Sequence, residues 1–123
     1  MINVTYSLSP NNTLSLDLSG HACSVSSGVD PVCAAVSMLV YTLAAETENL
    51  EGEKLLRRKP HIILESGGAH ISALPTLRGL SSAVQVFNMA MTGFELLARA
   101  YPQSINICSS EQRTGEKHEK LYS

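Results

Sequence analysis

Hydrophobic and polar residues alternate in two short segments near the start of the chain. Every second position is apolar in residues 2–8, and a leucine occupies every second position in residues 14–18. A period of two is typical of a strand with one buried face. Residues 9–12, Ser-Pro-Asn-Asn, separate the segments as a turn. We therefore expect an antiparallel hairpin.

Two longer segments predict helices. Residues 32–45 are nearly all apolar or small, Asp30 suits the N-cap, and Pro31 suits the first helical position. This composition predicts a helix buried on more than one side, with a break at Gly52 in the polar stretch that follows. Residues 77–101 carry apolar side chains at spacings of three and four, which predicts an amphipathic helix.

The remaining pattern completes the fold. Residues 61–65 and 69–74 flank Ser-Gly-Gly as a second hairpin, and isoleucines 105 and 107 indicate a last strand. The order ββαββαβ predicts an α+β, two-layer domain: a mostly antiparallel five-stranded sheet with two main helices. We expect residues 1–108 to form a single domain, and the polar residues 109–123 to form a flexible tail.

Composition narrows the class of protein. The chain is 44% hydrophobic and 16% charged, which indicates a globular protein, and a formal net charge of −2 argues against a nucleic-acid binder. The longest apolar stretch is too short and interrupted to span a membrane. No leader segment is evident before the first strand. Three cysteines, an odd number, suit a reducing cytosol, so we expect a cytoplasmic protein.

A histidine and a cysteine stand on either side of a small-residue loop. Cys33 is the third residue of the first expected helix, where unpaired N–H groups favour a thiolate. His21 ends the second strand and is placed to accept the thiol proton. Gly20 permits close backbone approach, and Gly28 supplies a hinge. This pattern indicates a cysteine nucleophile with a histidine base.

Two polar residues have alternative roles. Asp30 either caps the helix or orients the imidazole of His21. Ser37 lies four residues after Cys33 on the same helix face, and its hydroxyl bonds either within the site or to a backbone carbonyl.

Other interpretations of the cysteines remain open. Cys33 taken alone is typical of a small buried hydrophobic residue. His21, Cys23 and Cys33 provide three zinc ligands, at a spacing that matches no usual site. A Cys23–Cys33 disulfide is the basis of a thiol redox sensor. Cys108 is expected in the core.

The other histidines show no evident partner. His61 and His70 fall at expected strand ends, and we expect both on the surface.

Residues 20–37 resemble a known family. Gly-His-Ala, a short loop, Gly-x-Asp and then Val-Cys-Ala-Ala-Val-Ser are similar to the motif of the ribosomal-processing cysteine proteases, called Prp. The element order and length extend the resemblance to about residue 108. Pro31 departs from the aliphatic residue frequent in the family, Cys23 is not part of the motif, and the tail is longer than the family needs.

The resemblance implies a function and a site. Prp enzymes are cytosolic bacterial endopeptidases that remove an N-terminal extension from a large-subunit ribosomal protein, the twenty-seventh, after an aromatic pair. The family's catalytic dyad falls on His21 and Cys33, and its motif aspartate and serine fall on Asp30 and Ser37. It also implies a homodimer, a mobile loop over residues 22–29 and no cofactor. A non-catalytic ribosome-associated binding module is the alternative.

Overall fold

The computed structural model describes residues 1–20 and 31–109. Its elements are β1 (Ile2–Leu8), β2 (Leu14–Ser19), α1 (Pro31–Gly52), β3 (His61–Glu65), β4 (Gly68–Ala73), α2 (Leu80–Ala100) and β5 (Ile105–Ser109). The predicted order ββαββαβ is confirmed. The first helix begins at Pro31 and ends at Gly52, as the proline and glycine signals predicted.

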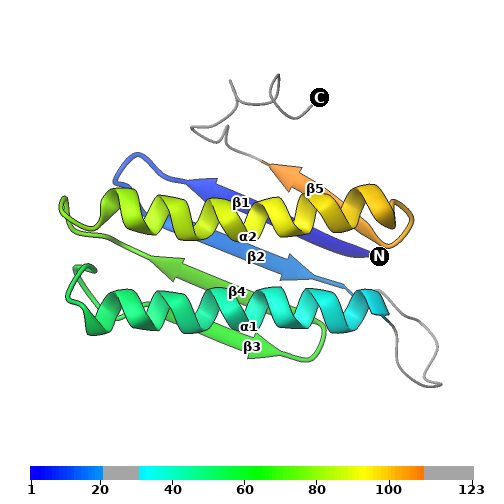
Figure 1. Cartoon of the computed structure of the whole chain (residues 1–123), viewed down its shortest axis with the longest axis horizontal. Helices are drawn as coiled ribbons and strands as arrows, with labels where there is room; N and C mark the ends of the chain where they lie inside the picture. The colour runs from blue at the N-terminus through cyan, green and yellow to red at the C-terminus, as the bar shows by residue number, and fades with distance from the viewer. Residues whose placement is uncertain (21–30, 110–123) are drawn as a thin grey trace.

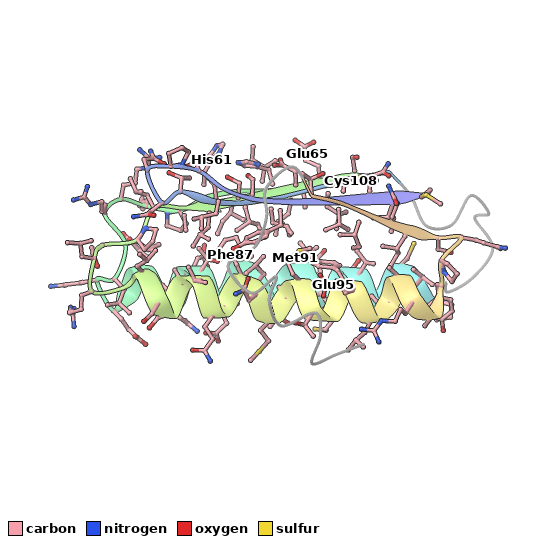
Figure 2. All side chains as sticks on the ribbon, turned by 90° about the horizontal axis from the view of Figure 1, so that it is seen from above. His61, Glu65, Phe87, Met91, Glu95 and Cys108 are labelled. Carbon is pink, nitrogen blue, oxygen red and sulfur yellow. The ribbon has the colours of Figure 1, made fainter. Side chains whose placement is uncertain are left out.

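The five strands form one sheet in the order β3-β4-β2-β1-β5. Three of the four strand pairs are antiparallel, and β1 pairs with β5 in parallel. Both helices cover the same face of the sheet, as the side view in Figure 2 shows. In Figure 1, α2 crosses β1 and β2, whereas α1 crosses β4 and β3. The molecule is therefore an α+β two-layer fold with a mostly antiparallel sheet.

The core lies between the helices and the sheet. Every second residue of β1 and β2 is buried on this face, which is what the alternating sequence predicts. Helix α2 contributes the large buried side chains Phe87, Met91 and Phe94. Phe87 and Met91 point toward the sheet in Figure 2, and the ring of Phe87 stacks on Tyr6 with centroids 6.1 Å apart. Aromatic packing of this kind supplies much of the apolar burial in a small core.

The expectation that the first helix is buried on more than one side is wrong. Its buried residues form a single stripe, and the opposite side is open, with Met38 64% and Tyr41 57% exposed. Its N-terminal part is apolar around the circumference because alanine, valine, leucine and other apolar residues fill most of positions 32–45. Within the described residues, only the sheet and α2 cover it, so half of that apolar surface faces outward.

The second helix begins later than predicted. Residues 77–79 form a turn before Leu80, and Leu77 is 86% exposed. The Thr76 hydroxyl accepts a hydrogen bond from the Gly79 backbone N–H and donates one to the Leu55 carbonyl. These side-chain hydrogen bonds stabilise a turn at residues 77–79 instead of a further helical turn. Leu77 is therefore not helical, although its spacing from the next apolar residues fits the helical period.

In the described part of the chain, the other face of the sheet carries polar side chains and no helix. His61 and Glu65 lie on this face in Figure 2. His70 places Nδ1 2.6 Å from an Asp17 carboxylate oxygen, and the ring of His61 meets His70 edge-on at 5.3 Å. The histidines are surface residues as expected, but the expectation that they lack partners is wrong, because β2 and β4 place Asp17 directly opposite His70.

Cys108 also lies on this helix-free face of the sheet. It is exposed and accepts a hydrogen bond from the Asn106 side chain, so its predicted place in the core is wrong. Cys108 pairs with Thr5, and its side chain points away from the core. Ile105 lies three residues earlier in β5, and its side chain points into the core. In the part of the chain that the structure describes, no helix is long and apolar enough to cross a membrane.

Candidate active site

Cys33 lies in the first turn of α1, as the sequence predicted. Its neighbour Val32 and the next-turn Val36 are buried against the sheet, and these two valines hold the helix start in place. Cys33 itself is half-buried, at the flank of the buried stripe. The first turn of a helix is the positive end of the helix dipole, which favours negative charge nearby.

A groove of about 390 Å³ opens beside this helix start. One wall is the face of α1 that carries Cys33, Ser37 and Tyr41, which recur at one helical turn. The other wall runs from Leu64 to Ala69, through the tip of the β3–β4 hairpin. Apolar side chains form the base, among them Ile2 and Leu18. The arrangement brings Cys33 and Ser37 together and leaves both facing a space that can hold part of a ligand.

The groove is almost free of charge. Among its described lining residues, Glu65 is the one charged residue, and its side chain lies on the helix-free face of the sheet in Figure 2. Polar and apolar groups both line the groove, so it can receive main-chain polar groups as well as apolar side chains of a bound molecule. The thiol of Cys33 and the hydroxyls of Ser37 and Tyr41 supply its polar chemistry on the α1 wall.

Gly20 has a conformation and a position that exclude a side chain. Its φ is +98°, and an added Cβ would lie 2.2 Å from the Met1 carbonyl oxygen. Its backbone N–H donates a hydrogen bond of 3.0 Å to the Gly67 carbonyl at the tip of the β3–β4 hairpin. Gly20, which follows β2 and immediately precedes His21, is thereby tied to the groove wall opposite Cys33.

Three predicted site residues, His21, Gly28 and Asp30, lie outside the described residues. Cys23, which the zinc and disulfide alternatives require, lies outside them too. Within residues 1–20 and 31–109, no group of three His, Cys, Asp or Glu side chains is arranged to hold a metal ion.

Sequence reasoning missed the wall opposite Cys33. Residues 64–69 predicted a hairpin turn and nothing else, because their proximity to Cys33 depends on the pairing of β2 with β4. That long-range pairing leaves no local signal. Tyr41 was also missed, although it lies two helical turns after Cys33 and the helical period places both on one face.

Comparison with known proteins agrees with this arrangement. The family model described as cysteine protease Prp matches residues 1–106. No curated protein matches the chain significantly.

Several solved structures share the fold. The essential ribosomal processing protease Prp from Staphylococcus aureus, in complex with a covalently linked product peptide, is 20% identical with a TM-score of 0.68, over 89% of this chain and 100% of that one. The same protease with a substrate peptide is 18% identical with a TM-score of 0.63, at the same coverage. SMU.848 from Streptococcus mutans is 28% identical, with a TM-score of 0.64, over 91% of this chain and 96% of that one.

The fold, the first-turn cysteine beside an open groove and the family match over most of the length all agree. The chain belongs to the Prp family of cysteine proteases and is a cysteine-type peptidase.

Proposed function

We propose that this peptidase removes the N-terminal extension of a large-subunit ribosomal protein, with Cys33 as nucleophile and His21 as base and proton donor. The observation that carries the proposal is the position of Cys33, half-buried in the first turn of α1 and lining the groove. Membership of the family and the peptide complexes of the S. aureus protease support the choice of substrate.

The proposed reaction proceeds in two stages. His21 takes the thiol proton, the Cys33 sulfur bonds to the scissile carbonyl carbon, and the carbonyl oxygen becomes an oxyanion. The positive end of the α1 dipole lies beside Cys33 and favours the negative charge of that oxyanion. The C–N bond then breaks, and His21 gives its proton to the leaving amine.

In the second stage water hydrolyses the thioester. His21 accepts a proton from water as the oxygen attacks the acyl carbon, and the C–S bond then breaks. His21 returns its proton to the sulfur, and the acid product loses its own proton to solvent and leaves as a carboxylate. The groove receives the side chains near the cleaved bond. We propose that Ser37 contributes a hydrogen bond within the site, and that Asp30 either caps α1 or orients His21.

The defining experiment compares two cysteines. Cys33→Ala is expected to abolish cleavage of a synthetic peptide that spans the host's ribosomal extension, whereas Cys108→Ala is expected to cleave like the unmodified protein. Mass spectrometry of the products reads the result. Equal cleavage by Cys33→Ala and the parent protein refutes the proposal. Binding of the peptide without cleavage by any form would indicate the non-catalytic binding module instead.

The state and location of the enzyme are part of the same proposal. We propose a cytoplasmic homodimer, on the ground of the resemblance to the Prp family. Sedimentation velocity of the full chain tests the dimer. A single species at the monomer mass, across the concentrations used for cleavage, would refute it.

A further inference from the structure

Among the residues that the structure describes, strand β3 has a neighbour on one side only. It forms one edge of the sheet and pairs with β4, while β5 forms the other edge. Two of its five residues, Ile63 and Leu64, are 38% and 43% exposed. Proline, lysine and bulges commonly protect edge strands from further pairing, and residues 61–65 contain neither proline nor lysine. This edge is open to an additional strand.

The register shows which backbone groups face outward. Glu65 pairs with Gly68 across a two-residue turn, so this pair exchanges ladder hydrogen bonds. Hydrogen-bonded pairs alternate along an antiparallel ladder, which directs the N–H and C=O groups of Leu64 and Ile62 away from β4. No backbone hydrogen bond of the described residues joins Ile62 or Leu64 to a segment beyond that edge.

The free edge leads into the groove. Leu64 is both an outward-bonding residue of β3 and a lining residue of the groove that contains Cys33. Its side chain lies on the helix-covered face of the sheet, because the side chains of its partner Ala69 and of the pair Ile62–Ile71 lie on that same face. Helix α1 crosses this strand in Figure 1. A chain lying along β3 therefore passes beside α1 toward Cys33.

We propose that the peptide substrate binds as an extended strand added to the free edge of β3, bonded to the main-chain groups of Ile62 and Leu64. The inference rests on the proposed function, because it takes Cys33 as the group that the peptide must reach. Main-chain bonds hold a peptide whatever its sequence, and they repeat at every second residue, about 7 Å apart. Alternate side chains then face the groove and supply selectivity.

The first test examines the peptide backbone. A peptide spanning the host's ribosomal extension is N-methylated at one position at a time, and binding to the Cys33→Ala variant is measured by fluorescence anisotropy. Methylation at two positions separated by one residue is expected to weaken binding roughly five- to tenfold each, because each loses a hydrogen bond. The intervening position is expected to bind like the parent peptide. An absence of this two-residue period overturns the proposal.

The second test examines the strand. Leu64→Pro removes an N–H that the ladder does not use, and proline is tolerated at such edge positions. Leu64→Ala removes the same side chain and keeps the N–H, so it is the matched control. Leu64→Pro is expected to bind the peptide roughly fivefold more weakly than Leu64→Ala, with the same thermal unfolding midpoint. Equal affinity of the two variants overturns the proposal.

The outcomes separate this inference from the proposed function. Cleavage of the parent peptide without a two-residue period refutes strand addition and leaves the protease in place. A two-residue period in binding without cleavage by the unmodified protein refutes the protease and leaves strand addition. Absence of both binding and cleavage refutes both. If Leu64→Pro instead converts a dimer to monomers in sedimentation and leaves peptide affinity unchanged, the edge belongs to a second copy and strand addition is refuted.

Discussion

The two helices cover the same face of the sheet but differ in what they bury. Helix α2 inserts Phe87, Met91 and Phe94, all essentially inaccessible, over β2, β1 and β5. Helix α1 buries valines and other small or medium residues over β4, and its N-terminal half borders the groove. We call the first region the packed half and the second the open half.

The difference shows how a small protein separates stability from chemistry. Large side chains in the packed half exclude water and bury apolar area, which stabilises the fold. Shorter side chains near the start of α1 leave space between the helix and the β3–β4 hairpin, and Cys33 faces that space. Substitutions should therefore affect unfolding in the packed half and affect binding in the open half.

The largest effect is expected in the packed half. Phe87→Ala removes a fully buried ring that stacks on Tyr6. We expect a loss of about 3–5 kcal/mol in the free energy of unfolding, from lost burial and the cavity that remains. Urea unfolding followed by circular dichroism measures it. A loss below about 1 kcal/mol would show that the packed half is not the source of stability.

The junction between β2 and the groove is expected to be the next most sensitive position. Gly20→Ala places a Cβ against the Met1 carbonyl at a positive φ, and we expect a loss of about 2–3 kcal/mol with reduced cleavage. Gly52→Ala is the matched control, since its Cβ meets nothing within 4 Å, and it should be neutral or stabilising by up to about 1 kcal/mol. Similar unfolding of the two variants would contradict the strain at Gly20.

The open half is expected to respond in binding and not in stability. Tyr41→Ala shortens a groove wall residue that is already 57% exposed. We expect the free energy of unfolding to change by less than about 0.5 kcal/mol. The KM for the extension peptide is expected to rise several-fold with kcat unchanged, since a wall contact binds substrate and transition state equally. An unchanged KM in steady-state kinetics would remove Tyr41 from the substrate path.

The smallest effect is expected on the helix-free face. Asp17→Asn removes the charge of the carboxylate beside His70, in a pair whose side chains are 56% and 31% exposed. Exposed pairs of this kind contribute at most about 1 kcal/mol, and urea unfolding should show a loss within that limit. A loss above about 2 kcal/mol would place the pair among the main stabilising contacts. It would contradict the expectation that substitutions on the helix-free face have little effect on stability.

Local patterns predicted the elements, and long-range pairing accounts for what they missed. Alternation identified β1 and β2, and Pro31 and Gly52 marked the limits of α1. The parallel pairing of β1 with β5 joins segments from opposite ends of the sequence, such as Ile2 with Ile105, and no local pattern in either segment specifies this pairing. The late start of α2 depends on Thr76 bonding to the distant Leu55 carbonyl.

The same distinction between local patterns and long-range pairing applies to the residues of the candidate site. A proline-initiated helix predicted the place of Cys33, and the helical period predicted that Ser37 shares its face. The opposite wall, residues 64–69, required the register between β2 and β4. The exposure of Met38 required knowing that no element of the described chain covers the outer side of α1.

The strand order has a practical consequence for handling the protein. Ile2 lines the groove and the Met1 carbonyl lies against Gly20, so a purification tag fused ahead of residue 1 would emerge beside the groove and compete with substrate. Strand β5 lies at the sheet edge remote from β3. In the Cys33→Ala variant, a reporter dye attached to Cys108 would therefore stand clear of the groove.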